Sequence, residues 1–182
     1  MNNQEPEVLR PNELSKLKEF AYACGDALID GEPIEIFYPE DLVIEPGQKE
    51  TRFSAITVAK IKAHPQNASL LSGLKGTANI YAIFTKASNA SGWEVKYVGQ
   101  RKSASIRERL SQHLIKKNAR TGSKLSKVHD ALSKGERIGV RMIKVEPDSL
   151  RTFVEEEIIS SYQDQLNEWN IQGVGRKGKN TK

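Results

Sequence analysis

The sequence predicts an α+β fold in which a small three-stranded antiparallel sheet is flanked by helices, with a mixed N-terminal extension. The segments 79–86 (NIYAIFTK) and 94–100 (EVKYVGQ) are rich in β-branched and aromatic residues, and the loop ASNASGW between them favours a β-hairpin. Residues 137–146 (RIGVRMIKVE) alternate as a third strand. Helical patterns between and after these strands give the order β-β-α-α-β-α, which is typical of helices packed on one sheet.

The first 75 residues are expected to form an extension with elements of its own. Apolar residues recur at helical spacing between residues 10 and 31, which predicts an amphipathic helix. The segment EPIEIFYPE predicts a short strand interrupted by Pro39. Residues 54–64 fit a strand or a helix, and we favour a helix. Residues 64–78 are rich in turn-forming residues, which predicts a connecting segment.

Three helices are expected in the second part of the chain. Residues 105–117 follow the hairpin, with Ser103 or Ser105 as N-cap, and residues 124–135 form the next helix after a basic loop. The third helix covers residues 148–169, with Asp148 or Ser149 as its cap. We therefore expect a domain at 76–170 after the extension at 1–75, followed by a basic flexible tail at 171–182.

Composition places the chain among globular proteins. It has 182 residues, of which 37% are hydrophobic, and this suffices for one good core. The sequence has no apolar run of membrane-spanning length and does not open like a signal peptide, so we expect a cytoplasmic protein that does not enter membranes. The only cysteine, Cys24, excludes an internal disulfide and a cysteine-based zinc site.

Charge is divided along the sequence. Residues 1–50 carry twelve acidic and four basic residues, whereas residues 96–127 carry ten basic residues and one acid, Glu108. A basic cluster of this kind is typical of a site for a polyanion, and equally of a solvated helix surface. Charge alone does not decide between these two interpretations.

The chemistry-bearing residues are few. Arg109 and His113 lie four residues apart and therefore on one helix face, where a guanidinium suits phosphate. Glu155 belongs to a run of three acids, and its place beside Val154 and three residues before Ile158 favours it as the acid nearest the sheet, where it would hold a divalent cation. The tail contains GVGRKG, but no strand precedes this motif, so we reject a dinucleotide site.

Residues 78–170 resemble the GIY-YIG nuclease family. NIY and YVG match its two signature motifs, with Asn79 in place of the first glycine. RERLSQH matches its arginine-bearing helix, and VEEEII matches its glutamate segment. QLN places Asn167 where the family keeps a structural asparagine, and Asn170 is the alternative.

The resemblance implies a DNA endonuclease that hydrolyses phosphodiester bonds with Mg²⁺, or with Mn²⁺. It implies that Glu155 binds the metal, that Tyr81 orients or deprotonates water with help from His113, that Arg109 neutralises the phosphate, and that Tyr97 completes the site. We expect further contacts to double-stranded DNA from the surrounding basic residues. They are Lys102, Arg107, Lys116, Lys117, Arg120 and Lys124.

Several functions stay open at this point. A restriction-type enzyme, as a homodimer or as a monomeric nicking enzyme, is favoured by the short extension, and a DNA repair or structure-selective nuclease is the alternative. A non-catalytic nucleic-acid-binding module and a protein-interaction protein are the other classes. Neither the target, nor the preference for DNA over RNA, nor single- or double-strand cutting can be inferred from the sequence.

Overall fold

The computed structural model describes residues 13–42, 44, 53–74, 76–116, 122–166 and 169–170. Within these ranges an antiparallel sheet is flanked by helices on both faces, which confirms the predicted α+β class. The strands follow the order β1-β4-β2-β3 across the sheet. Their bounds are Ile34–Ile36 for β1, Ile80–Lys86 for β2, Glu94–Gln100 for β3 and Arg137–Ile143 for β4.

The sheet has four strands where the sequence predicts three. The additional strand, β1, belongs to the N-terminal extension and pairs with β4, Ile34 lying opposite Val140 and Ile36 opposite Ile138. The segment was predicted as a strand, but its partner is about a hundred residues away, and a local pattern carries no information on such a pairing. The predicted number of strands is therefore wrong, because the prediction did not include β1 in the sheet.

Seven helices lie before, between and after these strands within the described ranges. Their bounds are Leu14–Ile29 for α1, Ala55–Ala63 for α2, Pro65–Gly73 for α3, Ile106–Leu114 for α4, Leu125–Ser133 for α5, Arg151–Ser161 for α6 and Gln163–Leu166 for α7. Short 3-10 turns at Ser103–Ser105 and Asp148–Leu150 precede α4 and α6. None of the helices in the described ranges is both long enough and apolar enough to cross a membrane.

Two helix predictions need correction. The connecting segment predicted at 64–78 contains α3, which Pro65 begins at a position where a missing N–H is harmless. The side chain of Asn67 holds this helix to β1 and α2 by donating to the carbonyls of Phe37 and Ile61. The single helix predicted at 148–169 is interrupted at Tyr162, which separates α6 from α7.

The predicted caps of α4 and α6 are also corrected in part. Ser105 is the N-cap of α4, but its side chain makes no capping hydrogen bond. The N-cap of α6 is Leu150, and Asp148 instead binds the Arg151 side chain, with 2.6 Å between Oδ2 and Nη1.

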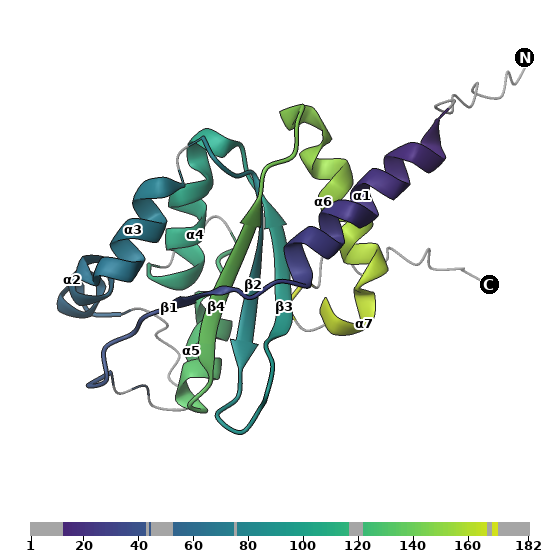
Figure 1. Ribbon diagram of the computed structural model, residues 1–182. Helices are drawn as coiled ribbons and strands as arrows, with labels where there is room; N and C mark the ends of the chain where they lie inside the picture. Colours follow the sequence, from purple (N-terminus) through teal and green to yellow (C-terminus); the bar gives the residue numbers. More distant parts are fainter. Residues whose placement is uncertain are drawn as a thin grey trace, which may run out of the picture.

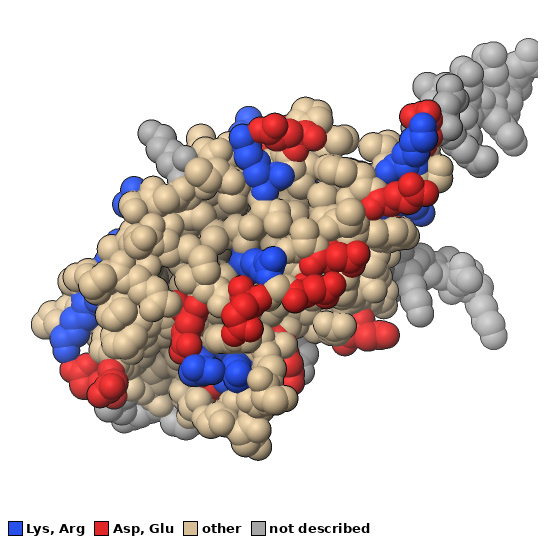
Figure 2. All heavy atoms as spheres, in the orientation of Figure 1, with Lys and Arg blue, Asp and Glu red and all other residues tan. Residues whose placement is uncertain are grey.

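The sheet separates two layers of helices (Figure 1). Successive residues of β2 face opposite layers of helices. Tyr81 and Ile83 pack with α2 to α5, whereas Ile80 and Ala82 pack with α1, α6 and α7. Within the described part of the acidic N-terminal segment, α1 lies on the second side, and Figure 2 shows acidic and basic side chains interspersed over the face that carries α1 and β1. Tyr81 points to the opposite side of the sheet.

A β-bulge interrupts the β2–β3 ladder. Ile83 lies opposite Tyr97, but Phe84 lies opposite Val95, so Lys96 is an extra residue in β3. The bulge changes the alternation: Val95 and Val98 pack on the α6 side, while Tyr97 points to the α4 side with Tyr81. Tyr97 shares the face of Tyr81 because it lies opposite Ile83 in the regular part of the ladder, and the bulge instead turns Val95 to the α6 side.

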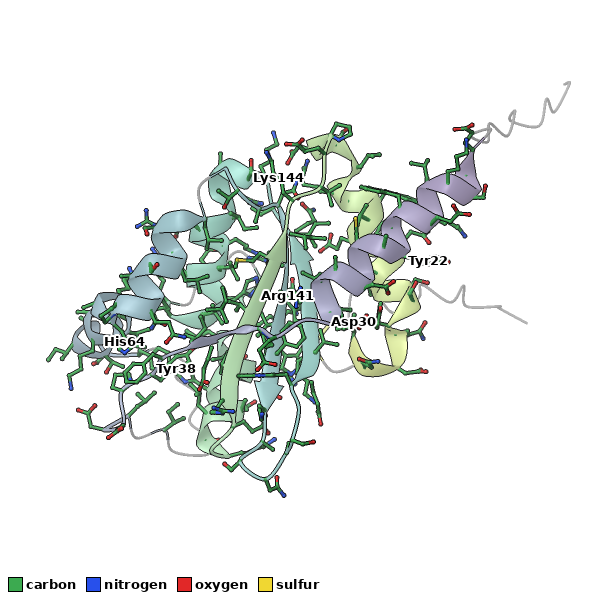
Figure 3. All side chains as sticks on the ribbon, viewed as in Figure 1. Tyr22, Asp30, Tyr38, His64, Arg141 and Lys144 are labelled. Atoms are coloured by element: carbon green, nitrogen blue, oxygen red, sulfur yellow. The ribbon has the colours of Figure 1, made fainter. Side chains whose placement is uncertain are left out.

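The N-terminal extension also supports the helix that carries Arg109 and His113. The hydroxyl of Tyr38, which follows β1, donates to the carbonyl oxygen of Leu114 at 3.0 Å, at the end of α4. Figure 3 shows Tyr38 just past the end of β1, on the side of the molecule that carries α2 and α3. The extension thus contributes a strand to the sheet and a contact to α4.

Candidate active site

Two tyrosines, one histidine and one arginine meet on the face of the sheet covered by α4. Tyr81 comes from β2 and is fully buried, and Tyr97 comes from β3 and is 9% exposed. Their ring centroids are 6.0 Å apart, and each ring also lies within 6 Å of the His113 ring from α4. The predicted helix face therefore does bring His113 to both tyrosines.

Hydrogen bonds fix the orientation of His113. Its Nδ1 atom accepts from the main-chain N–H of Lys124 at 3.0 Å, and its Nε2 atom lies 2.8 Å from the Tyr81 hydroxyl oxygen. Burial, together with the positive charges of Arg109 and Lys124, lowers the pKa of His113 to about 2, so the ring is neutral. Because Nδ1 is an acceptor, the ring proton is on Nε2, which donates to the Tyr81 oxygen.

Arg109 is the common neighbour of the other site residues. Burial and the adjacent Tyr97 hold the pKa of Tyr81 well above its ordinary value, and the Arg109 guanidinium opposes this by its charge and a hydrogen bond. Burial likewise raises the pKa of Tyr97, and Arg109 again lowers it. Since Arg109 also acts on His113 and Glu155, one guanidinium reaches all of the predicted catalytic residues.

Glu155 approaches this cluster from the other layer. It lies on α6, which packs beside β3, and β3 is the edge strand of the sheet. Its carboxylate accepts hydrogen bonds from the main chain and the side chain of Gln100, the last residue of β3, and its charge acts on Tyr97. The side chain therefore lies against Gln100 at the end of β3, within electrostatic range of Tyr97.

The environment of Glu155 disfavours the ionised form of its carboxyl group. Burial raises the pKa of Glu155 to about 7, against the lowering effect of the two Gln100 hydrogen bonds, and Glu156 raises it further. A bound cation would reverse this effect, because positive charge favours the ionised carboxylate. Among the residues that the structure describes, no group of three acidic, histidine or cysteine side chains forms a multi-ligand metal site.

A chain of polar contacts holds Glu155 in place. Arg151 binds Asp148 through Nη1 and donates from Nε to the Gln100 side-chain oxygen at 2.9 Å. Because the side-chain oxygen of Gln100 accepts from Arg151, its amide N–H group is the part that donates to Glu155. Sequence reasoning missed Gln100 and Arg151, although Gln100 directly follows the YVG motif and Arg151 lies four residues before Glu155 on the same helix face.

Asn170 supports the tyrosine strand from its open edge. Its side-chain oxygen accepts from the Val98 N–H at 2.9 Å, and its amide donates to the Val98 carbonyl at 2.7 Å. The asparagine thus pairs with β3 as a neighbouring strand would, between Tyr97 and Gly99. Its rival for this role, Asn167, lies outside the described residues.

Asn79 directly precedes β2 and begins the NIY segment. It is 1% exposed, and its side chain exchanges two hydrogen bonds of 2.8 Å with the main chain of Val145. It also donates to Asp148 at 3.0 Å. Asn79 therefore ties the start of β2 to the segment that leads into α6, the helix of Glu155.

The predicted phosphate contacts differ in their distance from this cluster. Lys124 lies over the Tyr97 ring, with Nζ 5.0 Å from its centroid, and is the one of them seen in contact with the cluster within the described chain. Lys102 and Arg107 are exposed at the start of α4, and Lys116 is bound to Glu108 at 3.0 Å. Lys117 and Arg120 lie outside the described residues.

Comparison with known proteins adds no relative from which a function could be transferred. No protein-family model matches the chain, and no curated protein or solved structure is significantly similar to it. The functional argument therefore depends on the geometry of the site.

Proposed function

We propose that the protein is a divalent-metal-dependent endonuclease that hydrolyses phosphodiester bonds in DNA. The observation that carries this proposal is the convergence of two phenols, one guanidinium and a single half-buried carboxylate from four different elements. A guanidinium that neutralises phosphate beside a lone carboxylate and two hydroxyl groups suits phosphoryl chemistry better than acyl or glycosyl transfer, which use other sets of groups.

The donor set fits Mg²⁺ or Mn²⁺. Mg²⁺ prefers oxygen ligands and keeps several waters, so that one or two carboxylates and the substrate phosphate suffice to hold it. Glu155 offers such a carboxylate, and burial raises its pKa to about 7 although the charge of Arg109 opposes this, so a bound cation would favour the ionised form further. When bound, the metal ion would act as a Lewis acid on the phosphate and would stabilise the leaving 3′ oxygen.

Tyr81 is the residue that would orient the attacking water. Its oxygen accepts the Nε2 proton of neutral His113 and a hydrogen bond from Arg109. Both donors stabilise the phenolate, which is the form of Tyr81 able to take a proton from water. His113 is therefore a positioning residue in this proposal, and it does not serve as the proton acceptor.

Arg109 would neutralise the charge that develops on the phosphorus oxygens in the transition state. Tyr97 contacts Tyr81 and is within electrostatic range of Glu155, and it would donate its hydroxyl proton to a phosphate oxygen. Lys124, held over the Tyr97 ring, places a second positive charge at the same position. The restriction-type activity and the homodimer are further parts of the proposal and follow from the family resemblance.

The test is cleavage of supercoiled plasmid in Mg²⁺ by the wild type and by Glu155→Ala. We expect nicked or linear product from the wild type, none from Glu155→Ala, and normal activity from Glu156→Ala, since Glu156 is the exposed neighbour on α6. Product ends with 5′ phosphate and 3′ hydroxyl should be religated by DNA ligase. A fixed sequence at the cut ends would support a restriction-type enzyme, and scattered ends a repair or structure-selective nuclease.

A non-catalytic nucleic-acid-binding module is the second candidate. One observation favours it: with a pKa of about 7, Glu155 is partly protonated at neutral pH and competes poorly for a metal until that proton is lost. A wild type that binds plasmid but never nicks it, in Mg²⁺ or Mn²⁺, would identify this module.

A further inference from the structure

A cavity lies on the same sheet face as the tyrosines, nearer to the β2–β3 turn. It has a volume of about 290 Å³. Its charged lining comes from β3, from α5 and from the turn before β4, and Thr85 and Trp169 complete it. Tyr81, Ile83 and Thr85 alternate along β2, so the cavity lies roughly 13 Å from Tyr81 at about 3.3 Å per residue. The charged lining residues are Lys96, Lys127, Asp130, Lys134 and Glu136.

The β-bulge aims one of these lysines into the cavity. Lys96 is the extra residue of β3, and without the bulge its side chain would point to the α6 side, where Val95 and Val98 pack. It forms a 2.8 Å ion pair with Glu94 at the rim and is itself only 22% exposed. The irregular strand therefore brings an ammonium group to the α5 side.

Helix α5 continues the positive charge from the candidate active site to the cavity. Lys124, at the start of α5, contacts the Tyr97 ring, and Lys127 and Lys134 follow at about 5 and 15 Å along the helix at 1.5 Å per residue. A DNA strand advances about 3.4 Å per phosphate. The span from Lys124 to Lys134 thus corresponds to about four nucleotides.

We propose that this cavity binds the sugar–phosphate backbone of the DNA strand about two to four nucleotides from the bond that is cut. This inference rests on the proposed function, since it places the strand by the candidate active site. Three lysines of the lining face Asp130 and Glu136, and Glu94 at the rim pairs with Lys96. Lys124 at the start of α5 therefore supplies the excess of positive charge over the candidate active site and the cavity together. Asp130 and Glu136 would repel a bound phosphate, so neutralising one of them should strengthen DNA binding. A purely structural role of the cavity predicts no such gain.

The experiment measures binding of a duplex of about 20 base pairs in EDTA, as affinity against salt between about 50 and 300 mM. The double variant Lys127→Ala/Lys134→Ala should reduce the salt slope by about 1 to 2 and weaken binding roughly tenfold per lost contact near 0.1 M salt. Asp130→Asn should instead tighten binding by about threefold, since it removes a repulsive charge. The control is Lys16→Ala, an exposed lysine on α1, on the other side of the sheet, which should match the wild type.

The inference is overturned if the double variant keeps the wild-type slope and affinity, or if Asp130→Asn binds no more tightly. Circular dichroism on each variant tests whether it is folded. Unfolding would weaken DNA binding, so the tighter binding expected for Asp130→Asn cannot result from it. Plasmid cleavage in Mg²⁺ tests the proposed function separately. If the wild type cleaves plasmid but the double variant keeps the wild-type salt slope, only the proposed DNA-binding role of the cavity is contradicted. If the double variant has a reduced salt slope but the wild type does not cleave, the cavity proposal is supported and the proposed nuclease function is contradicted.

Discussion

Gly99 lies directly opposite Tyr81 in the β2–β3 ladder, and a Cβ atom at Gly99 would stand 2.6 Å from the Tyr81 hydroxyl oxygen. The same atom would stand 2.8 Å from Cε1 of Tyr97. Both distances are shorter than real carbon contacts. The absence of a side chain at Gly99 therefore gives the two phenols the space in which they meet, and the glycine of YVG is a steric requirement of the site.

Gly99→Ala should accordingly displace the phenols and lower the cleavage rate by at least about a hundredfold, since misplacement by about 1 Å costs this much in a positioned site. Single-turnover cleavage of a labelled duplex measures the loss. Gly92→Ala is the matched control, because a Cβ atom there has no neighbour within 4 Å. A Gly99→Ala enzyme with wild-type activity would show that the phenols do not need this position.

Glu155→Gln should stabilise the protein at alkaline pH in the absence of metal. The pKa of Glu155 rises from 4.5 to about 7 on folding, so its contribution to stability is complete below pH 4.5 and is lost as the pH rises through 7. Removing the charge should raise the free energy of unfolding by on the order of 1–3 kcal/mol at pH 8 and by little at pH 4. Urea denaturation at both pH values measures the difference.

Mg²⁺ should raise the melting temperature of the wild type and leave that of Glu155→Gln unchanged, because a ligand stabilises the state that it binds. Glu156→Gln, which changes the exposed neighbour, should respond as the wild type does. An equal response of wild type and Glu155→Gln would place the metal elsewhere.

His113 should make the protein sensitive to acid. Its pKa falls from 6.5 to about 2 on folding. The neutral ring therefore contributes its full share to the free energy of unfolding above pH 6.5, and this contribution is lost progressively as the pH falls toward 2. This one group adds a slope of about 1.4 kcal/mol per pH unit below 6.5. In His113→Gln the unfolding free energy should change less steeply between about pH 6 and 4, as measured by denaturation at each pH. An unchanged slope would indicate a ring that is already charged.

Asn170→Ala should destabilise the edge strand. It removes both hydrogen bonds to Val98 and leaves a buried N–H and a buried carbonyl without partners, which costs about 2–4 kcal/mol. Thermal or chemical denaturation measures this, with Asn89→Ala in the exposed hairpin loop as control. If Asn170→Ala matched this control, the bonds to Val98 would be dispensable.

The sequence predicts well what depends on local pattern. The hairpin strands, the strand β4 and the helices α1, α2, α4 and α5 all follow from apolar periodicity and turn residues, and all are confirmed. The pairing of β1 with β4 and the helix α3 were missed, because the first depends on a distant partner and the second on the anchoring of Asn67. Local pattern says nothing about either.

The candidate site divides in the same way. The helix spacing of Arg109 and His113 and the choice of Glu155 among three acids were predicted, and the structure brings these residues to one place. The Gln100–Arg151 contact was not predicted, since the two residues are far apart in the chain and neither is unusual in its own segment. The assignment to the GIY-YIG family and the nuclease activity stay predictions.

Rate constants for single-turnover cleavage of an end-labelled duplex in Mg²⁺ test the central claim most directly, that the phenols, Arg109 and Glu155 act on one phosphate. We expect Tyr81→Phe, Arg109→Ala and the double variant to be slowed to a similar extent, by about a thousandfold or more, because groups that act as a unit are not additive. Two independent effects that multiply in the double variant, or a wild type without cleavage in Mg²⁺ and Mn²⁺, would contradict the account.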